Sequence, residues 1–175
     1  MSSESASTTT KHEPKSIIVT GGASGIGLAM SRHFASQGHR VAILDVNTQT
    51  GPQAAAEIAA EHPAATVVFK KCDVSSWDEQ AAVFKEVFHE HGDSLDVVMA
   101  NAGISEGGSV TVVNLKEAEP TKPRLTALEI NLLGVIYCEF PPPFLPLPLP
   151  PCFSLFLLFA PSRRRRALYP PIFKM

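Results

Sequence analysis

Four glycines near the start of the chain have a spacing suited to binding a phosphate group. They stand at positions 21, 22, 25 and 27, directly after residues 17–20, which have the β-branched composition of a strand. The backbone N–H groups of a helix's first turn have no partners within the helix, so a helix that begins here can bind an anion. A Cβ atom would obstruct both the pyrophosphate and the approach of the helix to the strand. The pattern therefore predicts a site for the diphosphate of a dinucleotide.

A helix is predicted directly after the glycines. Ile26, Met30 and Phe34 share one face of it, while Arg32 and His33 point away. The alternative is a strand–turn–helix corner that binds nothing. The order of strand, glycine turn and helix favours the binding site over that alternative.

The spacing of the turn resembles the cofactor motif of the short-chain dehydrogenase/reductase family, T-G-x-x-x-G-[IL]-G. The matching stretch is Thr20-Gly21-x-x-x-Gly25-Ile26-Gly27. The resemblance implies an oxidoreductase that moves hydride between a nicotinamide dinucleotide and a secondary alcohol or ketone. It also implies that five residues of the turn bind the cofactor: Gly21, Ser24, Gly25, Ile26 and Gly27.

A carboxylate ends the next apolar stretch. Residues 40–45 have the continuous apolar run of a parallel strand that is buried on both faces, and Asp45 closes it about twenty residues after the turn. There a carboxylate would accept hydrogen bonds from both adenosine ribose hydroxyls and repel a 2′-phosphate. No Lys or Arg stands at 22–24 or 46–47 to bind such a phosphate. We therefore expect NAD rather than NADP, with Asp45 and Val46 at the ribose; the alternative is a surface Asp that caps the next helix.

A third strand is predicted at residues 66–69, and Cys72-Asp73-Val74 follows it. This stretch matches a short D-V element of the family. The resemblance places Asp73 at the adenine amino group and the Val74 backbone at a ring nitrogen, with Cys72 beside them. The helix expected next carries Trp77, Ala81, Phe84 and Phe88 on one face, and Trp77 is expected in the core.

A fourth strand is predicted at residues 95–100, followed by Asn101-Ala102-Gly103. The family has N-N-A-G here, so Ala100 replaces its first Asn, and the resemblance places residues 101–103 along the path from adenosine to nicotinamide. Asn131 matches the family's Asn that holds a proton-relaying water; the alternative is a solvent-facing helix residue. Its helix is expected to begin near Pro123 and to run through Leu125, Leu128, Leu132 and Val135. The loop at 104–123 is also similar to that of NAD-dependent members such as 15-hydroxyprostaglandin dehydrogenase.

These elements together predict an α/β fold. Residues 16–140 are expected to form an incomplete Rossmann domain, a parallel sheet of strand order 3-2-1-4 with flanking helices and right-handed crossovers. The second helix is expected at 53–61, with Ala54, Ala55 and Ile58 facing inward. Residues 1–15 are expected to be a flexible arm, and 141–175 an irregular, Pro-rich tail.

The catalytic residues of the family have no match in this sequence. The family needs a Ser at the end of a fifth strand and a Tyr-x-x-x-Lys pair, whose spacing puts the cation beside the tyrosine and lowers the tyrosine pKa. Tyr137 and Tyr169 are the only tyrosines, and Pro141 and Phe173 stand four residues after them. We therefore expect the cofactor half of such an enzyme without turnover. The alternative is a non-catalytic fragment that binds NAD or pairs with complete subunits; oligomerisation is open, because the helices of the family's interface are largely missing.

Charge and cysteine content argue against several other classes. Residues 1–140 contain all 17 acidic residues and 10 of the 15 basic ones, so this part has no nucleic-acid footprint. The three cysteines form neither a disulfide framework nor a zinc spacing, and residues 1–15 contain no apolar or Arg-rich leader. We therefore expect a cytoplasmic protein with no metal site and no membrane partner. His89 and His91, near the end of a predicted helix, are expected to face solvent.

The composition changes abruptly at Pro141. Seven prolines between 141 and 151 exclude a helix or a central strand. A membrane anchor, a polyproline ligand and a translated intron are the three interpretations. The Pro-free apolar run at 152–160 is nine residues long, against the roughly 20 needed to span a membrane. Residues 138–140 can be encoded by TGT-GAG-TTT, which contains the splice-donor sequence GTGAGT; this favours the intron and leaves the fourth strand as a bare, aggregation-prone edge.

Overall fold

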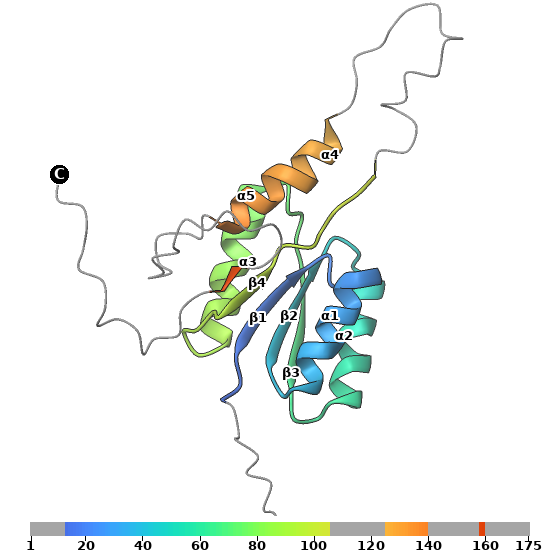
Figure 1. The fold of residues 1–175 in the computed structure, drawn as a ribbon, viewed down its shortest axis with the longest axis vertical. Helices are drawn as coiled ribbons and strands as arrows, with labels where there is room; N and C mark the ends of the chain where they lie inside the picture. The colour runs from blue at the N-terminus through green and yellow to red at the C-terminus, as the bar shows by residue number, and fades with distance from the viewer. Residues whose placement is uncertain (1–12, 106–124, 140–157, 160–175) are drawn as a thin grey trace, which may run out of the picture.

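Helices and strands alternate along the computed structural model, which describes residues 13–105, 125–139 and 158–159. The first of these ranges contains β1 (Ser16–Thr20), α1 (Gly25–Ser36), β2 (Arg40–Asp45), α2 (Thr50–Glu61), β3 (Thr66–Lys71), α3 (Trp77–Glu90) and β4 (Val97–Met99). The later ranges contain α4 (Thr126–Leu128), the π-helical turn η1 (Glu129–Leu133), α5 (Gly134–Glu139) and β5 (Leu158–Phe159). α1 and α2 cover one face of the sheet and α3 lies on the other (Figure 1).

The sheet has the order β3-β2-β1-β4-β5, and its first four strands are parallel. The predicted order 3-2-1-4 and the Rossmann-like arrangement are therefore confirmed. β1 lies in the middle, where Ile17 pairs with Val41 of β2 and with Val97 of β4. Every residue of β1 is buried, as expected for a central parallel strand covered on both faces.

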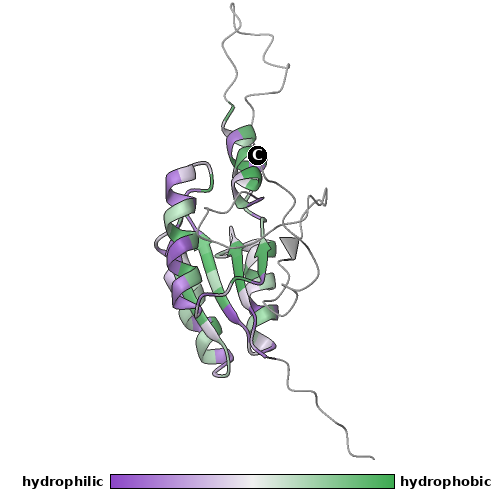
Figure 2. Cartoon of the chain, turned by 90° about the vertical axis from the view of Figure 1, so that its left-hand side faces the viewer, coloured by the Kyte–Doolittle hydropathy of each residue, from purple (hydrophilic) through white to green (hydrophobic). Residues whose placement is uncertain are grey.

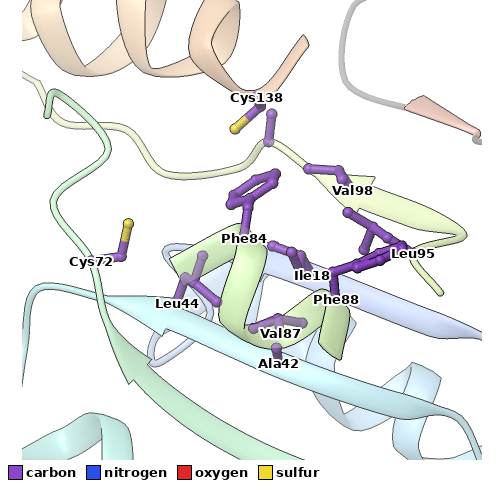
Figure 3. Packing of buried hydrophobic residues seen from close by; sticks show 11 residues of the cluster. Ile18, Ala42, Leu44, Cys72, Phe84, Val87, Phe88, Leu95, Val98 and Cys138 are labelled. Carbon is purple, nitrogen blue, oxygen red and sulfur yellow. The ribbon is translucent and has the colours of Figure 1, made fainter. Parts of the chain in front are cut away.

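Alternate residues of each strand point to opposite faces and build two cores. The core beneath α1 and α2 contains Ile17, Val19, Val41, Ile43, Ala35, Ala55 and Ile58. The core beneath α3 contains Ile18, Ala42, Leu44, Val98, Phe84, Val87, Phe88 and Cys138. Figure 3 shows the second core, with the Phe84 ring extending from α3 toward Cys138. The apolar strands and the polar outer surfaces of the helices separate clearly by hydropathy (Figure 2).

The buried face of α1 differs from the predicted one. Ile26 is 75% exposed, although the apolar pattern predicts it beside Met30 and Phe34, which are half-buried against the first core. The fully buried positions carry small side chains: Gly27, Ser31 and Ala35. α1 begins so close to the sheet that larger side chains have no room there, and Ile26 is left at the open end of the strands.

Two aromatic side chains of the α3 region also lie elsewhere than predicted. Trp77, expected in the core, is 40% exposed and makes an edge-on contact with Tyr137 of α5, with 5.7 Å between the ring centroids. His91, expected in solvent, is 2% exposed, and its Nδ1 lies 2.7 Å from the hydroxyl of Ser16. His89 is exposed as predicted and pairs with Asp93 at 2.8 Å.

The helix expected through residues 125–135 is present but contains a π-helical turn. The amide of Gly134 donates to the carbonyl of Glu129, five residues back. The leucines through which this helix was expected to run are about half-exposed: Leu125 (50%), Leu128 (54%) and Leu132 (52%). The expected start near Pro123 lies outside the described residues, as does most of the loop at 104–123. Within the described ranges, no helix has the length and apolar character needed to cross a membrane.

β5 differs from the expected irregular tail. Leu158 and Phe159 pair in antiparallel register with Val98 and Val97. The prediction that β4 forms a bare edge is therefore wrong over these two residues. Residues 1–12, 106–124, 140–157 and 160–175 lie outside the described part of the chain.

Candidate functional site

The residues predicted to bind a cofactor follow the carboxyl ends of four adjacent parallel strands. The glycine turn follows β1, Asp45 ends β2, Asp73 lies two residues after β3, and Asn101 lies two residues after β4. Because neighbouring parallel strands end at the same edge of a sheet, these segments converge there. That edge is where open α/β sheets bind ligands, at the point where the strand order reverses beside β1.

The glycine turn allows α1 to begin almost in contact with β1. A Cβ atom added to Gly27 would lie 2.1 Å from the Gly21 carbonyl oxygen and 2.7 Å from the side-chain nitrogen of Asn101. A Cβ added to Gly25 would meet nothing within 4 Å, although its φ of +51° favours glycine. Gly27 is therefore required by packing within the protein, whereas Gly25 faces open space at the start of the helix.

The first turn of α1 presents backbone donors to that space. The first hydrogen bond of the helix runs from the Leu28 amide to the Ser24 carbonyl at 3.0 Å, so the amides of residues 25–27 precede it. Ser24 is the N-cap residue and its side chain makes no capping hydrogen bond. Ser24, Gly25 and Ile26 are all exposed. Accessible amides at a helix N-terminus suit the diphosphate of a dinucleotide, so the local geometry fits the predicted group.

Asp45 lies beside this turn with its carboxylate partly exposed. Its Oδ2 accepts a hydrogen bond from the Ala23 amide at 3.1 Å, and its Oδ1 accepts one from the Asn47 amide at 3.0 Å. The first bond joins the end of β2 directly to the glycine turn, and Val46 next to it is 60% exposed. The start of α2 is capped by Asn47, whose Oδ1 accepts from the amides of residues 49 and 50 at 3.0 Å each. Asp45 is thus not the cap of the next helix, which was its alternative role.

Asp73 lies in a turn whose hydrogen bonds fix its carboxylate. Asp73 Oδ1 accepts from the amide of Ser75 at 2.9 Å and from its hydroxyl at 2.7 Å. These two bonds hold the pKa of the Asp73 carboxyl below its usual range, so the group is ionised at neutral pH. The Asp73 amide donates to Glu79 Oε2 at 2.9 Å.

Cys72 and Val74, on either side of Asp73, are buried. Burial raises the pKa of the Cys72 thiol to about 12, and it does the same for Cys138, so neither thiol is a nucleophile at neutral pH. Gln80 donates from its side-chain nitrogen to the carbonyls of Val74 at 2.7 Å and Gly134 at 3.0 Å. This side chain ties the segment after β3 to the beginning of α5.

The segment after β4 is held against the glycine turn by Thr20. The hydroxyl oxygen of Thr20 accepts from the amides of Asn101 at 3.0 Å and Ala102 at 3.1 Å. In return, the Asn101 side chain donates to the carbonyls of Thr20 at 3.1 Å and Gly21 at 3.4 Å. These bonds hold the segment 101–103 directly beside the glycine turn.

Asn131 reaches the same segment from η1. Its Oδ1 accepts from the Ile104 amide at 2.9 Å, and its Nδ2 donates to the Ile104 carbonyl at 2.8 Å. Gly103 lies directly beside it, because a Cβ added there would be 3.3 Å from Asn131 Oδ1. Asn131 is exposed, yet its amide is engaged on both sides, so it is not simply a solvent-facing residue.

Three residues that organise this edge were not predicted as site residues: Thr20, Glu79 and Gln80. Thr20 is the first letter of the glycine motif, which was a usable signal. The spacing Ser76-x-x-Glu79 was a second signal, since it is typical of a capping box at a helix start. No comparable pattern distinguishes Gln80, whose partners lie far apart in the sequence. In the described part of the chain, no three His, Cys, Asp or Glu side chains are grouped so that they could bind a metal ion.

Comparison with known proteins identifies the family. The sequence profile of the short chain dehydrogenases matches residues 15–139. An NADP-dependent dehydrogenase of Cochliobolus lunatus is 36% identical over 131 residues, which are 72% of this chain and 44% of that protein. The solved structure of an NADPH-dependent 3-quinuclidinone reductase from Rhodotorula rubra has a TM-score of 0.61 at 27% identity, covering 71% of this chain and 44% of the other. An alcohol dehydrogenase of the archaeon Thermococcus sibiricus, solved with 5-hydroxy-NADP, has a TM-score of 0.60 at 28% identity over 71% of this chain and 50% of its own.

This chain therefore spans half or less of the length of each of these relatives. The matched region contains β1 through α5, which includes the glycine turn, Asp45 and Asn131. With a family profile that covers residues 15–139 and a sheet of the same order, the assignment rests on both sequence and fold. The chain belongs to the short chain dehydrogenase family.

Proposed function

We propose that this chain binds NAD at the carboxyl edge of its sheet, as the cofactor half of an oxidoreductase that acts on a secondary alcohol or ketone. One observation carries the proposal: Asp45 Oδ2 accepts from the amide of Ala23, in the glycine turn that leads into the first turn of α1, where Gly25 and Ile26 are exposed. A diphosphate site and a ribose-binding carboxylate therefore lie side by side. NAD, when bound, supplies the nicotinamide that accepts or donates hydride.

Different residues along this edge would bind different parts of the cofactor. The amides of residues 25–27, with Gly21 and Ser24, would bind the diphosphate, and Asp45 and Val46 would bind the adenosine ribose. Asp73 would accept from the adenine amino group, with Cys72 and the Val74 backbone beside it. Residues 101–103 would line the path to the nicotinamide. In a complete active site, Asn131 would hold the water that relays protons.

The preference for NAD over NADP is argued from Asp45 alone. Among the described residues its partly exposed carboxylate accepts hydrogen bonds from two backbone amides, and it would accept further bonds from the ribose hydroxyls and repel a 2′-phosphate. The names of the similar dehydrogenase from Cochliobolus lunatus and of the reductase from Rhodotorula rubra refer to NADP and NADPH. A preference for NAD would distinguish this chain from those two proteins.

Residues 1–175 contain no Tyr-x-x-x-Lys pair, and we propose that they bind the cofactor without turnover. Removal of one general acid or base typically costs about 10²–10⁴ in rate, and here the tyrosine, the lysine and the serine are all unmatched. A cytoplasmic location belongs to the same proposal, and pairing with complete subunits is its alternative.

Calorimetric titration of the chain with NAD and with NADP tests this function. We expect NAD to bind more tightly than NADP, and Asp45→Ala to weaken NAD about tenfold while it narrows the difference between the two cofactors. Glu57→Ala is the matched control, since that carboxylate is exposed on α2 and pairs with Arg32 at 3.4 Å. Tighter binding of NADP by the unaltered chain would reject the NAD preference, and no binding of either dinucleotide would reject the site.

A further inference from the structure

We infer that Glu79 is a positioning residue that sets the selectivity of this site for adenine, because it holds the backbone of Asp73. The inference rests on the proposed function, in which Asp73 accepts a hydrogen bond from the adenine amino group. Glu79 itself lies in the first turn of α3 and, in this proposal, does not contact the cofactor.

The contacts of Glu79 depart from those of an ordinary helix cap. Ser76 is the N-cap of α3, and its side chain accepts from the Glu79 amide at 3.3 Å. In a capping box, the glutamate would return a hydrogen bond to the amide of the N-cap residue. Here that amide donates to the Asp73 carbonyl at 3.0 Å, and Glu79 Oε2 instead accepts from the Asp73 amide at 2.9 Å. Glu79 therefore has the spacing of a capping-box residue but binds Asp73 instead of the N-cap residue.

Asp73 is consequently fixed at three of its four polar groups. Glu79 binds its amide, the Ser76 amide binds its carbonyl, and Ser75 binds its Oδ1 through both amide and hydroxyl. Oδ2 has no hydrogen-bond partner among the described residues. An immobilised carboxylate with one oxygen left over is preorganised to accept a hydrogen bond from a ligand donor.

Lys71 completes the arrangement. Its ammonium lies 2.9 Å from Glu79 Oε1 and 2.8 Å from Oε2, so it is bound by both oxygens of the carboxylate. The hydrogen bond from Lys71, followed by that from the Asp73 amide, holds the pKa of Glu79 below its usual range. Glu79 is therefore an ionised acceptor, and charge-assisted hydrogen bonds are the stronger and shorter ones.

The role of Asp73 can be tested with a dinucleotide in which the adenine amino group is replaced. Nicotinamide hypoxanthine dinucleotide differs from NAD in carrying a carbonyl oxygen where adenine carries the amino group. That oxygen is an acceptor and would face the Asp73 carboxylate, which is also an acceptor. A site that depends on a held Asp73 should therefore discriminate between the two dinucleotides, and a site with a loosened Asp73 should discriminate less.

The test is calorimetric titration of the full chain with NAD and with this hypoxanthine analogue. We expect the unaltered protein to bind NAD about tenfold more tightly than the analogue. Glu79→Ala should weaken NAD by a similar factor and leave the analogue nearly unchanged, so the ratio falls toward one. Glu79→Gln should restore most of the ratio, because its amide oxygen can still accept from the Asp73 amide. Glu86→Ala is the matched control on the same helix, since it removes a similar ion pair, to Lys70 at 2.7 Å.

Each other outcome counts against the inference. Equal ratios for Glu79→Ala and the unaltered chain, with NAD binding intact, would overturn it and leave the proposed function standing. Equal weakening of both dinucleotides would show a general structural loss and would also overturn it, as would a Glu79→Gln variant no better than alanine. Absence of binding of both dinucleotides by the unaltered chain would overturn the proposed function as well.

Discussion

Asn131 and Ile104 are joined by two hydrogen bonds that run in opposite directions. The Asn131 amide accepts from the Ile104 N–H at 2.9 Å and donates to the Ile104 carbonyl at 2.8 Å, as a neighbouring strand would. The two residues belong to the π-helical turn η1 and to the segment after β4, with the loop at 106–124 between them in sequence. This link therefore fixes the position of η1 relative to the end of the sheet.

Asn131→Ala should loosen that link without unfolding the sheet. We expect a loss of about 1 kcal/mol in the free energy of unfolding, because two partly exposed hydrogen bonds are removed and alanine is a better helix former. Amide exchange should quicken at Ile104, measured by NMR, while the Thr20-bonded amides of Asn101 and Ala102 keep their protection. Leu132→Ala, at an exposed neighbouring position, is the control. Unchanged exchange at Ile104 in Asn131→Ala would contradict this account.

Two alanine substitutions in the glycine turn should separate folding from binding. Gly27→Ala places a Cβ 2.1 Å from the Gly21 carbonyl oxygen, a backbone atom, and should cost at least about 3 kcal/mol of stability. Gly25→Ala meets no atom within 4 Å and should cost only about 1 kcal/mol, from its left-handed backbone conformation.

The same two substitutions also test the proposed cofactor site. The open space beside Gly25 is where the diphosphate is proposed to lie, so Gly25→Ala should fold and lose at least about tenfold in affinity for NAD. Urea denaturation and NAD titration on one preparation measure both effects. A Gly25→Ala protein that binds NAD as well as the unaltered chain would place the diphosphate elsewhere.

The pH dependence of stability between pH 7 and 5 should be dominated by His91. Its ring is 2% exposed, and its Nε2 has no hydrogen-bond partner within the described residues. Burial, followed by the positive charge of Arg40, lowers its pKa from 6.5 to about 4. The unfolded chain therefore binds a proton at a higher pH than the folded chain does. Stability should be complete above pH 6.5 and fall as the pH drops toward 4, by about 2 kcal/mol at pH 5.

Urea midpoints at pH 7 and pH 5 measure this loss. His91→Gln removes the titrating group and should flatten the difference between the two pH values, even if it lowers stability at both. His89→Gln is the matched control, because it makes the same replacement at an exposed position near the end of α3 and leaves His91 in place, so the difference between the two pH values should persist. A pH slope that persists in His91→Gln would assign the effect to other groups.

The sequence predicted best where local pattern and burial agree. β2 was predicted at residues 40–45 and forms at Arg40–Asp45, because a parallel strand buried on both faces must be apolar throughout. The inward positions of α2 were predicted from apolar side chains that share one face of a helix, and Ala54, Ala55 and Ile58 are buried. The order of the strands followed from the alternation of strands and helices.

Prediction failed where contacts between distant segments decide the outcome. Ile26 has the pattern of a core residue, yet close packing at Gly27 and the open strand ends leave it exposed. His91 is buried because Ser16, 75 residues earlier, provides a partner for its ring. Likewise, the Ser76-x-x-Glu79 spacing is a local signal, but the bond from Glu79 to Asp73 depends on how the chain leaves β3.

Pairing of β5 with β4 predicts that the tail protects the sheet edge. Val97 and Val98 are buried and pair with Phe159 and Leu158 in antiparallel register. Leu158→Pro removes a backbone donor and cannot maintain a strand, so exchange of the β4 amides should quicken and the protein should aggregate more readily.

Hydrogen exchange by mass spectrometry and light scattering at equal concentration measure these two effects. Ala167→Pro is the matched control, because it introduces the same residue into the tail outside β5. If Leu158→Pro and Ala167→Pro behave alike, the edge of β4 does not depend on β5. A difference between them at β4, with no change at β2 or β3, would show that β5 protects the edge of the sheet at β4.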